Sequence, residues 1–270
     1  MMRAAAFAAA ALFLAGCSAS VPQSGDATSF DRATQDNLAH GERIATVLGC
    51  LDCHGADLAG RDHSDELGTL WTANLTRSAA MHSDEELRVM IVTGRRPDRD
   101  LWDMPSHLFG HLSAGDMASL IAFIRSKPTT GEVHPPPTFG PELRAMMTKG
   151  EWTSSRQQVE QQAKVTLPDL CKAHAQGRYI VQATCAECHG KDLRGGPPPF
   201  PGDPPRPDLT MMVPACEPVD FATLMRTGKA AGDRELVMMS AVARDRFAHF
   251  TPQEVEAVGS YIAALAQREP

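Results

Sequence analysis

The chain has 270 residues and a formal net charge of −7 at pH 7. This length favours about two domains of roughly 100–200 residues each. The acidic balance argues against a nucleic-acid partner, because binding a polyanion needs a surplus of positive charge. Aromatic residues make up only 6% of the chain, so large side chains are scarce for building two hydrophobic cores.

The first 16 residues have the features of a secretory signal peptide. Arg3 gives a short positive region, and residues 4–14 form an apolar run that is too short to span a bilayer. The end of this run, Leu14-Ala15-Gly16-Cys17, resembles the lipobox of bacterial lipoproteins. The resemblance implies cleavage before Cys17 and a lipid on that cysteine. The alternative is an ordinary signal peptide in which Cys17 has no such role.

Residues 17–35 are rich in Ser, Thr, Asp and Gly, which predicts a flexible tether. No later apolar run approaches the length of a membrane span. We therefore expect a periplasmic protein that is attached to a membrane through its lipid. The sequence leaves the choice between inner and outer membrane open.

Two pentapeptides, at residues 50–54 and 185–189, share the pattern C-x-x-C-H. This pattern is the attachment signature of a c-type haem, whose vinyl groups react with the two thiols while the His binds the iron. Zinc sites and redox dithiols are the alternatives. A redox dithiol does not need the His, and the halves of a zinc site usually lie ~12–20 residues apart, whereas these copies lie 135 residues apart. The residues predicted to hold two covalent haem c groups are Cys50, Cys53, His54, Cys185, Cys188 and His189.

The pentapeptides belong to a longer internal repeat. The offset between matching residues stays at 134–136 and reaches 138 near the end of each copy. We therefore expect two tandem domains, at residues 36–127 and 169–270, joined by a Pro-rich linker and cover at 128–168. A second Pro-rich stretch, at 197–207, predicts a rigid loop over the second haem or a partner-docking loop. The matches include Asp57-Leu58-Ala59-Gly60 with Asp192-Leu193-Arg194-Gly195, Asn74-Leu75-Thr76 with Asp208-Leu209-Thr210, Thr93-Gly94 with Thr227-Gly228, and Ser113-x-x-Asp116 with Thr251-x-x-Glu254.

Apolar periodicity and capping residues predict three helices in each unit. In the first unit they lie at 38–49, at 84–92 after the N-cap Ser83, and after the N-cap Ser113. Gly41 would let another helix approach closely. The first and last helices of each unit should cross and close over the haem, which makes the fold all-α. The second unit repeats the plan with predicted helices at 171–184, at 218–225 and after the N-cap Thr251.

A six-coordinate iron needs a second axial ligand, and Met is the usual partner of His in an electron carrier. Met104 is the candidate in the first unit, because it lies in a loop before the last helix and is followed by Pro105. The other methionines of this unit fit packing positions better. They are Met81, Met90 and Met117.

In the second unit Met238 and Met239 compete as the iron ligand. They lie ten and eleven residues past Gly228, while Met104 lies ten past Gly94, so spacing does not decide between them. Three histidines near the Met loops are rival ligands that would lower the reduction potential, although each more often would be solvated or bonded to a haem propionate. They are His107, His111 and His249.

Of the seven cysteines, one is assigned to the lipid and four to haem, which leaves two without a predicted role. An exported protein lies in an oxidising compartment, so we predict a disulfide between Cys171 and Cys216. The alternatives are two free thiols, or a thiolate ligand to iron.

Both units are similar to class I cytochrome c domains: a Gly-bearing helix, C-x-x-C-H-G, an Asn/Asp-Leu-Thr loop, a Thr-Gly helix end, a Met loop and a capped final helix. The family pattern favours Met239 as the second distal ligand. The tandem arrangement resembles the multihaem cytochrome c subunits of bacterial dehydrogenases for alcohols, aldehydes and sugar acids. Those subunits usually carry three haem units, whereas this chain has two pentapeptides, and its lipobox replaces the C-terminal membrane helix of some relatives.

The resemblance implies a periplasmic dihaem electron carrier rather than an enzyme. It would accept electrons from a dehydrogenase and pass them to another cytochrome or a terminal oxidase of the respiratory chain. One alternative is a dihaem redox enzyme, such as a peroxidase or a thiosulfate-oxidising cytochrome. Another is a structural or sensory lipoprotein in which the haem only stabilises the fold.

Overall fold

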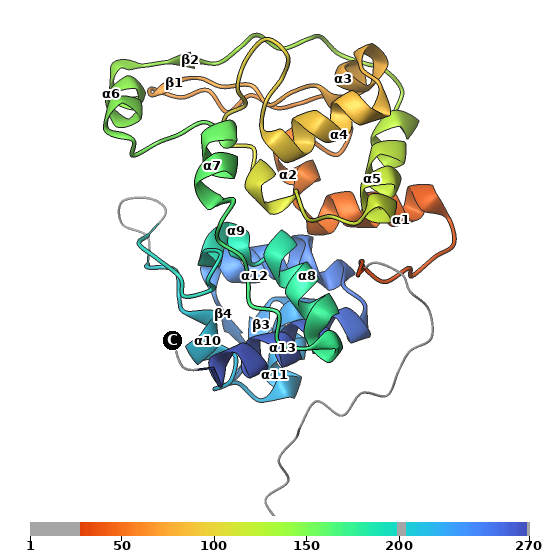
Figure 1. The fold of residues 1–270 in the computed structure, drawn as a ribbon, viewed down its shortest axis with the longest axis vertical. Helices are drawn as coiled ribbons and strands as arrows, with labels where there is room; N and C mark the ends of the chain where they lie inside the picture. Colours follow the sequence, from red (N-terminus) through yellow and green to blue (C-terminus); the bar gives the residue numbers. More distant parts are fainter. Residues whose placement is uncertain (1–27, 199–203, 269–270) are drawn as a thin grey trace, which may run out of the picture.

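The computed structural model describes residues 28–198 and 204–268 and is mostly helical, as predicted. Figure 1 shows two groups of helices, with α1–α5 in the upper group and α8–α13 in the lower one. The predicted signal peptide, Cys17 and the middle of the 197–207 loop lie outside the described residues. Among the described residues, no helix is long and apolar enough to cross a membrane.

The helices are α1 Asn37–Val47, α2 Cys50–His54, α3 Leu75–Met81, α4 Asp84–Thr93, α5 Ala114–Ser126, α6 Pro141–Lys149, α7 Ser155–Gln162, α8 Ala175–Ala183, α9 Ala186–His189, α10 Leu209–Met212, α11 Pro218–Thr227, α12 Val237–Asp245 and α13 Pro252–Ala266, with 3-10 turns η1 Ser106–Leu108, η2 Lys172–His174 and η3 Phe247–His249. The strands are β1 Gly68–Thr69, β2 Thr138–Phe139, β3 Lys229–Ala230 and β4 Arg234–Glu235. The strands form two antiparallel pairs, β1 with β2 and β3 with β4.

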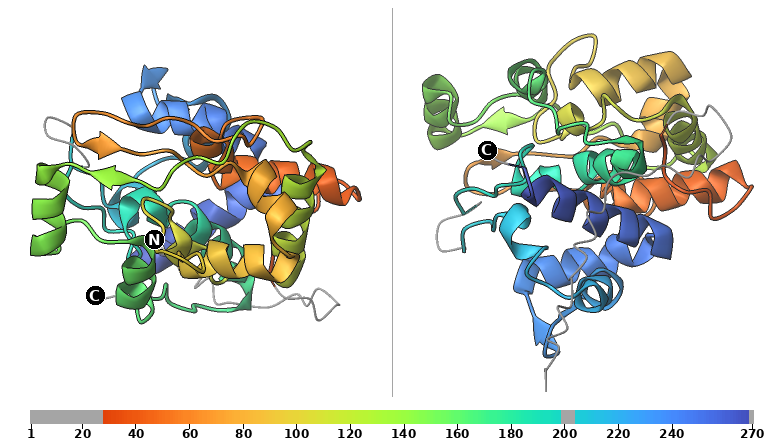
Figure 2. Two further views of the ribbon diagram at one scale, coloured as in Figure 1. Left: turned by 90° about the horizontal axis from the view of Figure 1, so that it is seen from above. Right: turned by 60° about the horizontal axis from the view of Figure 1, so that its bottom comes forward.

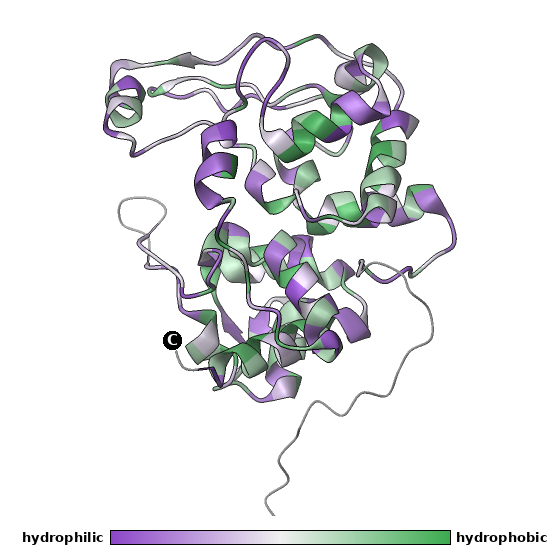
Figure 3. Ribbon diagram, viewed as in Figure 1, coloured by the Kyte–Doolittle hydropathy of each residue, from purple (hydrophilic) through white to green (hydrophobic). Residues whose placement is uncertain are grey.

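The first and last helices of each unit cross at a glycine, as the sequence predicts. A Cβ atom on Gly41 of α1 would lie 2.0 Å from the carbonyl oxygen of Ser119 in α5. One on Gly177 of α8 would lie 2.1 Å from the carbonyl oxygen of Ala257 in α13. The two backbones therefore touch at each crossing, and any larger residue would push the helices apart. Figure 3 shows hydrophobic and hydrophilic stretches alternating along α4 and α5, as expected of helices that bury one face.

The predicted helix starts are confirmed for the capped helices. Ser83 and Glu86 form a reciprocal capping box at α4, and Thr251 and Glu254 form one at α13. Ser113 also caps α5 through its side chain. The helix predicted over 171–184 is shorter than expected, because η2 precedes it and α8 starts only at Ala175.

Residues 28–35 differ from the predicted flexible tether. Phe30 is 1% exposed and packs edge-on against Tyr179 of the second unit, with 5.5 Å between the ring centroids. Its backbone amide donates to the Asp116 carboxylate at 3.0 Å. A single aromatic residue in a polar stretch therefore anchors this segment between the two units, because burying a ring of that size outweighs the polar character of its neighbours.

The two units contact each other through equivalent residues. The Tyr179 hydroxyl of α8 donates to Asp116 of α5 at 2.7 Å, and Arg43 of α1 donates to Glu254 of α13 at 2.8 Å. Arg43 and Tyr179 lie at matching places of the repeat, as do Asp116 and Glu254. Within the first unit, His40 makes a buried contact of 3.0 Å to the same Asp116 carboxylate. Such a reciprocal exchange is the pattern of a two-fold interface, here formed within one chain.

The segment at 128–168 covers the first unit. Its strand β2 pairs with β1, and Figures 1 and 2 show the two strands running side by side. The Asn74 side chain donates to the carbonyls of Thr130 at 2.8 Å and Glu132 at 3.0 Å. Trp152 packs on Trp102 with 4.4 Å between the ring centroids. The linker is therefore a fixed part of the first unit over much of its length.

Candidate haem-binding sites

The first pentapeptide forms the short helix α2, which follows α1 after a turn at Gly49. His54 is buried, and its Nδ1 donates to the carbonyl oxygen of Ala73 at 2.8 Å. A carbonyl can only accept, so this bond places the proton on Nδ1 and leaves Nε2 able to bind a metal. Burial lowers the pKa of His54, while the Ala73 carbonyl acts in the opposite direction. The hydrogen bond to Ala73 therefore presents Nε2, the nitrogen through which this histidine would bind iron.

The second pentapeptide repeats this arrangement on α9. His189 Nδ1 donates to the carbonyl oxygen of Pro207 at 2.9 Å. Ala73 and Pro207 lie at matching places of the repeat, 134 residues apart. Burial also lowers the pKa of His189, against the effect of the Pro207 carbonyl. Each histidine is thus oriented in the same way by an acceptor outside its own motif.

The loops after the two pentapeptides have the same backbone path. Leu58 and Leu193 both take a positive φ, of 58° and 62°, and both are fully buried. The amide of Gly60 donates to His54 O at 2.9 Å, and the amide of Gly195 donates to His189 O at 2.8 Å. This strained conformation is unusual for leucine and is kept in both copies, which supports a common role for the two loops.

The first cysteine of each pentapeptide has a thiol with a raised pKa. Burial raises the pKa of Cys50 to about 12 and that of Cys185 to about 11. A reactive dithiol needs a lowered thiol pKa. Within the described residues, no group of three metal-ligating side chains that could hold an ion is found. The raised thiol pKa values therefore argue against a reactive redox dithiol at either pentapeptide.

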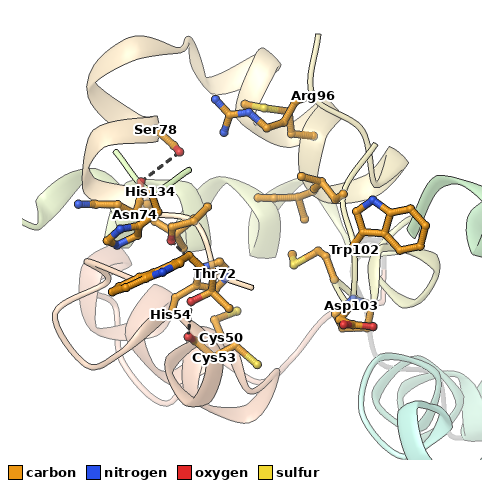
Figure 4. A pocket seen from close by; sticks show the side chains of 18 of the residues that line it. Cys50, Cys53, His54, Thr72, Asn74, Ser78, Arg96, Trp102, Asp103 and His134 are labelled. Carbon is orange, nitrogen blue, oxygen red and sulfur yellow. Dashed lines mark hydrogen bonds between the residues drawn. The ribbon is translucent and has the colours of Figure 1, made fainter. Parts of the chain in front are cut away.

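A cavity of about 370 Å³ lies over the first pentapeptide. Cys50, Cys53 and His54 line one side, and Figure 4 shows Arg96 at the opposite end of the cavity from the two cysteines. Met104 also lines the cavity, whereas the rival ligands His107 and His111 do not. The lining is mostly apolar, as a porphyrin ring requires.

The polar groups of this cavity fit a haem. Nε of Arg96 is buried and makes no hydrogen bond within the described part of the chain, although the Asp98 carboxylate lies 3.8 Å away. Haem carries two carboxylates at the edge opposite its vinyl groups, and Arg96 lies opposite Cys50 and Cys53 (Figure 4). A propionate would satisfy the orphaned donor through a charge-assisted bond.

The loop that carries Met104 is held by the covering segment. The Met104 amide donates to the hydroxyl of Ser155 in α7 at 3.1 Å, and Trp152 donates to Asp103 at 3.0 Å. Sequence analysis gave Met104 from its loop position and Pro105, but it gave no sign that residues of the linker support this loop.

Of the two rival histidines of the first unit, His111 is engaged in a contact with the second unit. His111 Nε2 donates to the carbonyl of Tyr179 at 3.1 Å, across the interface between the units. Burial and the charge of Lys191 lower the pKa of His107 to about 4. In the second unit His249 is exposed.

The second site differs at its predicted Met loop. Met238 and Met239 lie in the first turn of α12 rather than in a loop. Met239 packs against the hydrophobic core, while Met238 is 49% exposed. Ser106 follows Met104 by two residues as Ser240 follows Met238, and both serines are fully buried. This register pairs Met104 with Met238 rather than with Met239.

Cys216 carries a free, exposed thiol. The predicted disulfide between Cys171 and Cys216 stays a prediction. Cys216 lies just before α11, at the outer surface of the second unit.

Several cavity residues were missed by sequence analysis. His134 stacks on Trp71 with 4.3 Å between the ring centroids, and its Nε2 bonds to the Ala59 carbonyl at 2.8 Å. Both rings line the first cavity, together with Trp102. The Pro-rich stretch around His134 predicted a spacer, and no local signal showed that it would fold back onto the haem site.

One arginine connects the two pentapeptides. Arg246, which follows α12, donates to Asp52 at 2.6 Å and to Glu187 at 2.7 Å. Asp52 and Glu187 are the matching residues of the two C-x-x-C-H motifs. Burial opposes the charge, but Glu187 and Asp52 together raise the pKa of the Arg246 guanidinium. Arg246 and Glu187 also line the first cavity.

Comparison with known protein families gives one match. A family model for cytochrome c matches residues 174–266, which span α8 to α13 and the second pentapeptide. None of the curated proteins compared with the chain matches it. The matched domain supports a c-type cytochrome, and its family implies a covalently bound haem c and electron transfer.

Proposed function

We propose that the protein is a dihaem c-type cytochrome that carries electrons, with one haem c at each pentapeptide. The observation that carries the proposal is the paired geometry of His54 and His189. Each donates through Nδ1 to a carbonyl at a matching place of the repeat, which leaves Nε2 for iron. The family match covers only the second unit, and the repeated backbone supports extending the assignment to the first.

The chain's own residues would bind, orient and shield the two groups. The haem iron supplies the one-electron chemistry when it is bound. Cys50 and Cys53 would hold the first haem, and Cys185 and Cys188 the second. Arg96 would neutralise a propionate of the first haem. The covering segment at 128–168 would keep water from the first iron, which favours the less charged ferrous state.

For the distal ligands we propose Met104 and Met238. The family pattern favoured Met239, which packs against the hydrophobic core as Met104 does, so core packing does not distinguish the two candidates. Met238 is half-exposed and occupies the place that matches Met104 relative to the buried serines. Two Met-ligated irons would have no open position for a substrate, which favours a carrier over a peroxidase or a thiosulfate-oxidising enzyme.

The cellular role follows from the resemblance and the leader. A lipid on Cys17 would hold the protein at a membrane facing the periplasm. A periplasmic dehydrogenase would be the electron donor, and another cytochrome or a terminal oxidase the acceptor.

The near-infrared absorption of the ferric protein tests this function. Iron bound by His and Met gives a charge-transfer band, and we expect two equivalents of it per chain. Met104→Ala and Met238→Ala should each remove half of the band, and Met239→Ala should leave it unchanged. A high-spin spectrum from either haem of the unmodified protein would instead indicate an open iron and a dihaem enzyme.

A further inference from the structure

The proposed function assigns no role to Arg246, although this side chain contacts both haem-binding motifs. It lies between α2 and α9, the helices of the two C-x-x-C-H motifs, and its Nε and Nη1 atoms bond to different carboxylates. Its side chain is 15% exposed. A forked guanidinium suits this bridge, because it can direct separate donors to two acceptors at once.

The bridge spans 194 residues to Asp52 and 59 residues to Glu187. Arg246 thus joins a residue of the first motif to the matching residue of the second. Without it, two carboxylates would face each other in a half-buried place, where repulsion is stronger than in water. The arginine therefore holds together two motifs that their own charges would drive apart.

Gly49 provides the space that the guanidinium needs. A Cβ atom on Gly49 would lie 2.2 Å from the Cζ atom of Arg246, and the residue has a φ of +74°. The guanidinium therefore packs directly against the turn that leads into the first pentapeptide.

We infer that Arg246 joins the two haem-binding motifs into one electrostatic unit, fixing their separation and setting a charge that both haems share. The inference rests on the proposed function, because it assumes a haem at each motif. Arg246 is a positioning residue here, since it would act through Asp52 and Glu187. Together the three side chains carry a net charge of −1, from one guanidinium and two carboxylates.

Redox titration of the dihaem protein tests the inference. Arg246→Gln changes the shared charge from −1 to −2, which favours the ferric state, so the reduction potentials of both haems should fall. Glu187→Gln changes the charge from −1 to 0, so both potentials should rise, including that of the first haem, which belongs to the other motif. A general destabilisation of the fold would not shift the reduction potentials in opposite directions in the two variants.

Arg244→Gln is the matched control. Arg244 also lies at the end of α12 and forms an ion pair with Glu235 at 3.0 Å, but both side chains are about half exposed and, among the described residues, neither forms an ion pair with Asp52 or Glu187. We expect this variant to leave both potentials unchanged. The inference is overturned if Arg246→Gln and Arg244→Gln behave alike, or if Glu187→Gln moves the potential of the second haem only.

Measuring the distance between the two irons distinguishes the positioning role of Arg246 from the effect of its charge. Pulsed electron paramagnetic resonance of the fully ferric protein reports the coupling between the two irons. Arg246→Gln should lose the single well-defined coupling of the unmodified protein, and Arg244→Gln should keep it. An unchanged coupling in Arg246→Gln would overturn the positioning role. Haem content is measured first, so that a missing haem refutes the proposed function rather than this inference.

Discussion

The two units share one backbone plan but enclose their sites differently. In the first, the segment at 128–168 folds back over the cavity, and His54 is buried. In the second, the family-matched domain, His189 is only partly buried, and the Met pair lies on the helix α12. Repeating a haem-binding motif therefore does not fix the environment of the haem, which depends on the segments that cover it.

This difference predicts two distinct reduction potentials. A haem shielded from water favours the ferrous state, since the ferric form carries more charge. We expect the first haem to have the higher potential, although both would have His and Met ligands. Redox titration with variants that lack one haem would assign the two potentials, and a first haem at or below the second would contradict the effect of the cover.

The largest expected effect comes from removing the thiols of one motif. Cys50→Ala with Cys53→Ala should abolish covalent haem at the first site alone, and Cys185→Ala with Cys188→Ala should do so at the second. Each double variant should retain one haem per chain in a denaturing gel stained for haem. Cys216→Ala is the control and should keep two haem groups per chain. Loss of a haem from this variant would contradict the assignment of haem attachment to the two pentapeptides alone.

The next largest effect should come from substituting the glycines at the helix crossings, which occur in both units. Gly41→Ala and Gly177→Ala each place a methyl group about 2 Å from a backbone oxygen. Overpacking of this kind costs about 1–3 kcal/mol or more. Thermal unfolding should show both variants strongly destabilised. Gly115→Ala in α5, with only the Ser113 hydroxyl at 4.0 Å, should be neutral or slightly stabilising, and a similar loss there would contradict the packing argument.

Loosening the covering segment at 128–168 should destabilise the protein less, and only in the first unit. Asn74→Ala loses the helix cap of α3 and two bonds to the covering segment, which together cost about 1–3 kcal/mol. Amide hydrogen exchange in 128–168 should accelerate. Asp208→Ala removes the matching cap of α10 in the second unit and should leave exchange in 128–168 unchanged.

The smallest effect concerns pH. Burial, with the charge of Lys191, lowers the pKa of His107 from 6.5 to about 4. Below about pH 6.5 the imidazole of His107 is protonated in the unfolded chain but stays neutral in the folded protein. The free energy of unfolding is therefore highest above pH 6.5 and decreases as the pH falls towards 4. His107 is partly exposed, so the loss should stay below about 3 kcal/mol. His107→Gln should flatten the profile, and an unchanged acid slope would exclude His107 as a cause.

Much of the fold was predictable because it depends on local signals. The caps at Ser83, Ser113 and Thr251 and the crossing glycines follow from short-range patterns that the structure repeats. The C-x-x-C-H motifs likewise carry their chemistry within five residues. These features need no knowledge of distant parts of the chain.

The features that sequence analysis missed depend on contacts between distant segments. Nothing near Phe30 indicates that it fills a space between the units, and nothing near Arg246 indicates that it bridges two motifs. Met238 and Met239 lie in a helix rather than in a loop, although Met238 has the same spacing from its Thr-Gly pair as Met104. Such contacts arise from tertiary packing, which periodicity and spacing do not encode.

The central claim is that both pentapeptides bind haem covalently. A pyridine haemochrome assay on the purified mature protein, combined with its intact mass, tests this claim most directly. The account predicts two haem c groups per chain. A single haem, attached only within the family-matched second unit, would contradict the assignment of the first unit and with it the bridged dihaem arrangement.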